Sequence, residues 1–312
     1  MNGETVAILG YGNQGAAHAL NLRDSGCDVI VGARPGRGAE ARAKEAGFAV
    51  FAPAEAAARA RVLALLVPDD AVGAAWPEVG AALGAGACVV FAHGFNLLYG
   101  DVPVRADADV VLVSPCGPGR VLRQVYERGE GLPAYLAVHR DGSGRAWERA
   151  EAYAGWLGCA RARLWRTTVR EETEVDLFGE QSVLCGGMNA LVTAAWETLA
   201  DAGYSPEIAY LEVVHQLKFL ADLLHERGVS GLRRGISGTA LYGDVSRGPR
   251  VVNAETRRVL AEMLAEIRSG AFAKELAAEV AAGRPVVHRE VARAESHPME
   301  TARRRALGLP EA

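Results

Sequence analysis

This chain lacks long apolar runs and lacks an excess of charge of one sign. No apolar segment approaches the roughly 18 to 20 residues that a membrane-crossing helix needs, so no membrane association is expected. The first residues enter a strand pattern at once and leave no room for a signal peptide, so we expect a cytoplasmic protein. The 38 acids nearly balance the 34 lysines and arginines without a basic stripe, so nucleic acid is not an expected partner.

The cysteines lack the spacing of a disulfide framework or a zinc site. There are five, an odd number, and no two form a CxxC pair. We therefore expect most of them to be buried thiols, at Cys27, Cys88, Cys116, Cys159 and Cys185.

A glycine-rich turn near the start of the chain predicts a dinucleotide site. The turn follows the apolar strand pattern of residues 5–9 and precedes a helical segment, which is the setting in which GxGxxG binds a pyrophosphate. Further strand and helix signals alternate as far as residue 138, which predicts a parallel, doubly wound α/β sheet of the Rossmann type over residues 1–167. The expected cofactor-binding residues of the turn are Gly10, Tyr11, Gly12, Asn13, Gln14 and Gly15.

The end of the second predicted strand indicates which dinucleotide binds. An acid there would accept hydrogen bonds from a ribose 2′-hydroxyl, but the segment after this strand carries Arg34 and Arg37 instead. Two guanidinium groups can pair with a 2′-phosphate, so NADPH is favoured, with NADH as the alternative if both arginines are only solvated loop charges. Pro68 and Gly119, at later strand ends, are also expected to contact the cofactor.

Two other loops at strand ends carry polar groups where such sheets bind ligands. His93 ends the fifth predicted strand, where a neutral imidazole could exchange a proton or polarise a carbonyl. Cys116 follows the next strand and could be a nucleophile or a metal ligand, although an inert thiol is the more common case.

The second half is predicted to be helical, and it carries two pairs of polar residues spaced four apart. Asp176 and Glu180 form the first pair, while Glu212 and Gln216 form the second. Residues four apart on a helix share a face, so each pair could present oxygen ligands to a hard cation such as Mg²⁺, unless both faces are merely solvated. The segment from residue 237 to 243 is expected to be a loop or helix end, and the chain from Arg284 onward ends in a loosely held tail.

The chain resembles the short-form (class I) ketol-acid reductoisomerase family over nearly its whole length. The resemblance lies in the glycine-rich turn and in these segments: residues 92–96 (AHGFN), 171–181 (EETEVDLFGEQ), 185–187 (CGG), 206–210 (PEIAY) and 242–244 (YGD). It implies conversion of 2-acetolactate-type substrates to 2,3-dihydroxy acids, by a Mg²⁺-dependent alkyl migration and then reduction by NAD(P)H. It also implies a knotted helical domain over residues 168–312 and a homodimer, or a higher oligomer, with active sites between subunits.

The resemblance assigns roles to individual residues. Asp176, Glu180 and Glu212 match metal ligands, His93 matches the active-site histidine, and Ser237 matches a substrate-binding serine. The chain departs from the family pattern at Cys116, which replaces a lysine, at Gln216, which replaces a glutamate, and at Leu241, which replaces an acid.

These departures favour a divergent reductase. Alkyl migration needs two Mg²⁺ ions and proton handling, whereas hydride transfer needs a nicotinamide, one polarising group and a proton donor. We therefore expect one Mg²⁺ or none, and reduction of a ketone or imine in a small polar substrate, without migration, in specialised (natural-product) metabolism. The alternatives are an authentic ketol-acid reductoisomerase of branched-chain amino-acid synthesis and a catalytically silent nucleotide-binding dimer.

Overall fold

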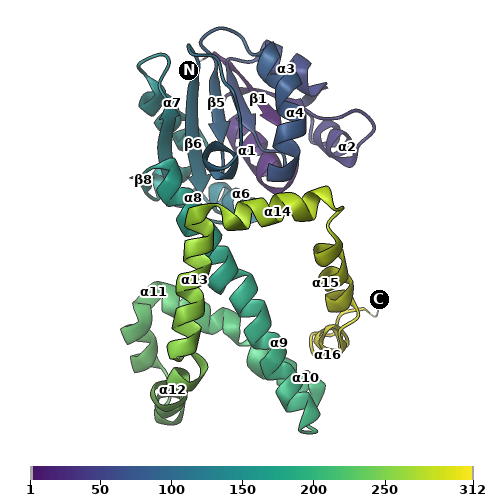
Figure 1. Cartoon of the computed structure of the whole chain (residues 1–312), viewed down its shortest axis with the longest axis vertical. Coiled ribbons are helices and arrows are strands. Elements are labelled where there is room, and N and C mark those ends of the chain that lie inside the picture. Colours follow the sequence, from purple (N-terminus) through teal and green to yellow (C-terminus); the bar gives the residue numbers. More distant parts are fainter. Residues whose placement is uncertain (1–2, 311–312) are drawn as a thin grey trace. The chain divides into compact units, whose positions relative to one another are not determined.

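The computed structural model describes residues 3–310, and the chain divides into two units, Met1–Val175 and Asp176–Ala312. The first unit is an eight-stranded sheet in the order β3-β2-β1-β4-β5-β6-β7-β8, covered by helices (Figure 1). The strands are β1 (Thr5–Leu9), β2 (Asp28–Gly32), β3 (Ala49–Phe51), β4 (Val62–Leu65), β5 (Cys88–Phe91), β6 (Asp109–Pro115), β7 (Ala134–Arg140) and β8 (Leu164–Arg166).

Both faces of this sheet are buried because successive strand residues point to opposite sides. In β1, Val6 and Ile8 pack into one apolar cluster on one face of the sheet, while Ala7 and Leu9 pack into another on the opposite face. The expected α/β fold of this half is confirmed. Its helices are α1 (Asn13–Asp24), α2 (Gly38–Glu45), α3 (Pro53–Arg59), α4 (Asp69–Ala82), α5 (Phe95–Leu98), α6 (Gly119–Glu127), α7 (Ala146–Trp156) and the 3₁₀ turn η1 (Cys159–Arg161).

Two neighbouring strands, β7 and β8, run against the other six, so the expected parallel sheet is parallel over six of its eight strands. β7 pairs antiparallel with β6, which sets Ser114 opposite Tyr135 and Pro115 opposite Ala134. A backbone hydrogen bond of 2.8 Å from the Cys116 N–H to the Pro133 carbonyl continues this contact. The first residues of β7 therefore lie at the edge where the parallel strands end, which is the edge at which such sheets bind ligands.

The second unit is helical, as predicted. The division between the units falls within α8 (Val169–Gly179), and the helices that follow are α9 (Gly186–Asp201), α10 (Pro206–Tyr210), α11 (Leu217–Gly235), α12 (Gly238–Val251), α13 (Ala254–Ser269), α14 (Ala271–Ala281), α15 (Pro285–Glu295) and α16 (Pro298–Ala306). Two π-helical turns, η2 (Glu180–Leu184) and η3 (Leu211–His215), interrupt the regular helix. The knot that the resemblance implies stays a prediction.

The polar last part of the chain forms the helices α15 and α16, and a loosely held tail stays a prediction for the residues after Ala306, the last two of which lie outside the described residues. α16 packs on α9 and α10, where buried Ala302 joins Trp196, Ala209 and Tyr210 in one small apolar cluster. Polar contacts hold the same region, because His297 Nε2 lies 3.1 Å from Glu197 Oε1. Across the described residues 3–310, no helix combines the length and the apolar character that a membrane span requires.

Candidate active site

The glycine-rich turn has the geometry that a bound pyrophosphate needs. Gly10 has a φ of 92°, and a Cβ at Gly15 would lie 1.9 Å from the Gly10 carbonyl oxygen, so both positions exclude larger residues. A Cβ at Gly12, in contrast, would meet no atom within 4 Å. The first and third glycines are therefore required by packing, whereas the second leaves open backbone where a ligand can approach.

Side chains of the turn fasten it to the loop after β6. Gln14 Nε2 donates to the Gly117 carbonyl at 3.0 Å, and Asn13 Oδ1 accepts from the Arg120 N–H at 3.0 Å. A Cβ at Gly119 would lie 2.2 Å from the Asn13 carbonyl oxygen. Asn13, Gln14 and Gly119 thus hold the glycine-rich turn against the segment that follows β6. This structural role comes in addition to the cofactor contacts that the sequence predicts for them.

The Tyr11 side chain points into the core. It is 4% exposed, its ring centroid lies 5.8 Å from that of Phe48, and burial raises the pKa of its phenol. Arg42 of α2 donates to the Tyr11 carbonyl at 3.0 Å. Tyr11 can therefore contact a ligand only through its backbone, and its side chain anchors the turn in the core.

The two arginines predicted to read a 2′-phosphate are exposed and available. Among residues 3–310 neither Arg34 nor Arg37 forms a salt bridge, and Arg37 directly precedes α2. Glu40 braces their loop by accepting the Gly36 N–H at 2.6 Å, and hydrogen bonds from Lys44 and from Gly36 hold the pKa of Glu40 below its usual value. Pro68 lies at the end of another loop, as the residue that precedes α4.

His93 has a buried carboxylate as its partner. Glu172 Oε1 lies 3.4 Å from His93 Nδ1, and Glu172 Oε2 accepts the Gly94 N–H at 3.0 Å. The Glu172 side chain is fully buried, while that of His93 is 22% exposed. This arrangement fixes the orientation of the imidazole and directs Nε2 away from the carboxylate, as expected for a group that exchanges protons.

Asp69 adds a second carboxylate to the surroundings of His93. Burial raises the pKa of Asp69, although the nearby His93 and a hydrogen bond of 2.8 Å from Asn96 Nδ2 act in the opposite direction. The sequence singled out neither Glu172 nor Asp69. Glu172 stands within the segment that carries the family resemblance, but only the fold shows that it is buried against His93.

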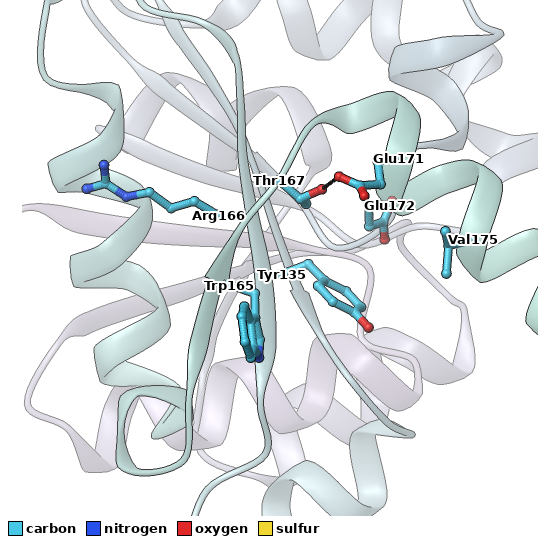
Figure 2. Close-up of a pocket in the computed structure, with 7 residues that line it drawn as sticks. All are labelled: Tyr135, Trp165, Arg166, Thr167, Glu171, Glu172 and Val175. Atoms are coloured by element: carbon cyan, nitrogen blue, oxygen red, sulfur yellow. Dashed lines mark hydrogen bonds between the residues drawn. The ribbon is translucent and has the colours of Figure 1, made fainter.

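A pocket of about 320 Å³ lies on the same unit, beside Glu172. Figure 2 shows its lining side chains, with Arg166 turned away from the others and the Thr167 hydroxyl directed at Glu171. Arg166 stacks instead on Trp147 and pairs with Glu151. The lining residues are Tyr135, Trp165, Arg166, Thr167, Glu171, Glu172 and Val175.

The predicted metal ligands lie at the two π-helical turns. Glu180 is the first residue of η2, with Asp176 four positions before it, and Glu212 lies within η3. Gln216 follows η3 and donates from Nε2 to Glu212 Oε2 at 2.6 Å. The i, i+4 spacing was thus read correctly as one helical stretch, but the sequence did not reveal the π turns, which are often found at functional sites.

One copy of the chain does not gather these ligands into a complete site. Within the described residues 3–310 there is no group of three or more His, Cys, Asp or Glu side chains that could hold a metal ion. The carboxylates of Asp176 and Glu180 are nevertheless the oxygen donors that Mg²⁺ prefers. The donor chemistry therefore fits a magnesium ion, and its coordination would have to be completed from outside this set.

Ser237 and Cys116 are exposed, and Leu241 is half-buried. Ser237 caps α12 by accepting the Ala240 N–H at 3.2 Å, so residues 238–243 are helical and only the helix-end alternative for this segment was right. Cys116 is exposed beside the loop that Gln14 contacts. Leu241 lies one turn into α12.

Comparisons with known proteins cover both units. A model described as acetohydroxy acid isomeroreductase, NADPH-binding domain, matches residues 1–163, and one described as ketol-acid reductoisomerase, C-terminal domain, matches residues 169–308. Proteins named ketol-acid reductoisomerase (NADP(+)) from Xanthomonas campestris pv. campestris strains B100 and 8004 are each 52% identical over 282 residues, covering 90% of this chain and 85% of theirs.

Solved structures agree. The NADH-preferring ketol-acid reductoisomerase from an uncultured archean matches with a TM-score of 0.96 and 35% identity, covering 100% of this chain and 96% of that one. A semialdehyde dehydrogenase NAD-binding protein from Cupriavidus necator matches with a TM-score of 0.65 at 21% identity, over 85% of this chain and 99% of that chain. The second likeness shows the fold alone.

Proposed function

This chain belongs to the ketol-acid reductoisomerase family, and we propose that it is an NADPH-dependent ketol-acid reductoisomerase that converts 2-acetolactate to 2,3-dihydroxyisovalerate. The observation that carries the proposal is the 52% identity to proteins named for this activity, which extends over 90% of the chain. The sequence alone leaves this activity as an alternative to a divergent reductase. The comparisons support it better than the divergent reductase that the sequence favours.

In this proposal the chain's own residues bind the cofactor and handle a proton. The backbone at Gly12 receives the pyrophosphate, and Arg34 and Arg37 pair with the 2′-phosphate. His93, oriented by Glu172, gives or takes a proton at Nε2.

Asp176, Glu180 and Glu212 would hold magnesium, and Ser237 would bind the substrate. A bound Mg²⁺ supplies polarisation of the substrate's oxygens. Because one chain does not complete the ligand set, we include a homodimer, with ligands from both subunits, in the proposal.

The test is turnover with two substrates. Purified protein is incubated with Mg²⁺, NADPH and either 2-acetolactate or 3-hydroxy-3-methyl-2-oxobutyrate, and products are identified by proton NMR. Dihydroxyisovalerate from 2-acetolactate supports the proposal. Failure to consume 2-acetolactate, while the rearranged ketoacid is reduced, contradicts it.

That contrary outcome defines a second candidate, reduction without migration. A specific observation favours it: the Gln216 amide is hydrogen-bonded to Glu212 where the resemblance implies a second carboxylate, and Cys116 presents a thiol where it implies an ammonium. Under this candidate, the double variant C116K/Q216E should gain turnover of 2-acetolactate. If NADPH binds but neither substrate is reduced, the silent-dimer alternative gains.

Cofactor choice has its own test. Changing Arg34 and Arg37 to alanine should weaken NADPH binding by about 1.5 to 3 kcal/mol for each lost phosphate contact, and should leave NADH binding nearly unchanged. Titrations of both nucleotides, with Arg59→Ala as a control at an exposed arginine of α3, measure this. If the two substitutions weaken NADPH binding and NADH binding equally, the arginines do not recognise the 2′-phosphate.

A further inference from the structure

The helical unit contains a pocket that the proposed reaction does not use. It has a volume of about 280 Å³ and is lined by Arg227, Gly231, Arg234 and Gly235. Two of the four lining residues are arginines and two are glycines, so the walls combine positive charge with little side-chain bulk. This pocket therefore differs in chemistry from the one beside Glu172.

The backbone builds this pocket through a break in α11. Gly228 has φ 65° and ψ 177°, which is not helical and which residues with a side chain rarely adopt. The break lays the stem of Arg227 against Gly231, since a Cβ at Gly231 would lie 2.3 Å from Arg227 Cβ. The Arg227 side chain thus lies on the same side as Arg234, although the two residues belong to different helical segments.

The charges in the pocket are not balanced by acids. Among residues 3–310 neither Arg227 nor Arg234 forms a salt bridge, and Arg234 donates only to the Ser230 hydroxyl, at 3.3 Å. Arg233, between them, is paired with Asp244 at 2.6 Å. Over α11 and α12, residues 217–251, five arginines and one lysine stand against three acids, so the surrounding segment carries a net positive charge as well.

We propose that this pocket binds the anionic group of a small molecule, either a phosphate or a pair of carboxylates. Guanidinium groups present planar pairs of N–H donors that match the oxygens of both groups, and two of them without a counter-charge repel each other until an anion lies between them. A dianion is favoured over a monoanion because it neutralises both. The site goes beyond the proposed function, which assigns no anion to α11.

The experiment uses the full-length protein without nucleotide, so that its outcome does not depend on turnover. Isothermal titration calorimetry is run with inorganic phosphate, with malonate and with chloride at constant ionic strength. We expect saturable binding of phosphate or malonate, and the tighter of the two identifies the group that the site prefers. Chloride should not compete at equal concentration.

Variants locate the binding. R227Q/R234Q should weaken it at least tenfold, whereas R247Q/R250Q, which removes the same charge from exposed positions outside the pocket, should change it less than twofold. G231A tests the geometry without changing charge, because its Cβ must displace Arg227, and should also weaken binding. If circular dichroism shows that R227Q/R234Q is not folded, the single variant R234Q replaces it in the titration.

Two results would overturn the proposal. One is the absence of saturable binding of either dianion to the unaltered protein at millimolar concentration. The other is equal weakening by R227Q/R234Q and R247Q/R250Q, which would show that only the general positive charge of the segment attracts anions.

Discussion

The two units bury their apolar residues to very different extents. The α/β unit places strand and helix side chains in two large clusters, one on each face of its sheet. The helical unit has one small cluster, around Trp196 and Tyr210. Of the 24 large hydrophobic side chains that are exposed within residues 3–310, Tyr135, Trp165 and Val175 lie in the first unit and the other 21 in the second.

This difference indicates that the first unit is stabilised by its own core and that the second needs a partner surface. Exposed apolar area on this scale is uncommon in a protein that functions as a monomer. The proposed homodimer would cover it and would also supply the ligands that one chain lacks.

The largest effect is expected from a change within the close-packed α/β unit. Gly15→Ala puts a methyl group 1.9 Å from the Gly10 carbonyl oxygen, so the turn or α1 must move. We expect a loss of about 3 kcal/mol or more in the free energy of unfolding, and loss of NADPH binding. Urea unfolding and fluorescence titration measure both.

Gly73→Ala is the matched control, because a Cβ there meets no atom within 4 Å and Gly73 lies within α4. It should raise stability by about 0.5 to 1 kcal/mol. If Gly15→Ala lowers stability no more than Gly73→Ala does, the glycine-rich turn is not closely packed. The contrast between a closely packed α/β unit and a helical unit that needs a partner would then be wrong for the α/β unit.

The next effect tests the exposed apolar surface of the helical unit. Leu191 of α9 is 55% exposed, so in an isolated chain Leu191→Asp would cost almost nothing. In a dimer that buries it, the same change should weaken association by about 2 to 4 kcal/mol, seen by light scattering across a dilution series. Asn189→Asp, at an exposed polar position of the same helix, is the control.

A smaller effect is expected at Glu172. Glu172→Gln keeps the shape of the side chain but removes the negative charge beside His93 Nδ1. We expect kcat to fall by about tenfold to a hundredfold, with the basic limb of the pH profile displaced to lower pH, because the imidazolium loses its counter-charge. Glu148→Gln, at an exposed position of α7 outside the pocket, should leave both unchanged. An unaltered pH profile in Glu172→Gln would mean that the carboxylate serves packing only.

The smallest effect concerns a buried histidine of the α/β unit. Burial lowers the pKa of His18 from 6.5 to about 3, and His18 Nδ1 lies 3.0 Å from the Tyr153 hydroxyl. Between pH 6.5 and pH 3 the imidazole of His18 is protonated in the unfolded chain but not in the folded chain. The free energy of unfolding therefore falls as the pH drops from 6.5 towards 3.

Between pH 7 and pH 5 this residue alone should cost about 2 kcal/mol. Urea unfolding at the two pH values, for the unaltered protein and for His18→Phe, isolates its contribution. The slope should be shallower in the variant, and identical slopes would show that His18 is not the responsible group.

The sequence predicted those features that depend on local pattern. The glycine-rich turn, the long buried strands and the helical second half follow from periodicities and turn residues that neighbouring residues specify. The three-residue strands β3 and β8 were missed because so short a run has no readable alternation. The reversed direction of β7 was missed because direction depends on the connection that precedes the strand.

The candidate site was predicted less completely, because its central contact joins residues 79 positions apart. Nothing near Glu172 in the sequence indicates that it becomes a fully buried carboxylate against His93. Likewise, nothing in the polar residues 284–306 indicates that Ala302 is covered, which only tertiary packing shows. Local pattern thus identified candidate residues, and the fold determined which of them meet.

The reversal of β7 has a consequence for altering the pocket beside Glu172. Tyr135 pairs with Ser114 and lies at the start of its strand, whereas Ser114 lies near the end of β6. This part of the ligand-binding edge of the sheet therefore comes from a sequence segment far from the cofactor turn at residues 10–15. Tyr135 and Trp165 can therefore be varied to reshape the neighbouring pocket without changing any residue of that turn. Engineers could diversify these two aromatic positions as an independent module.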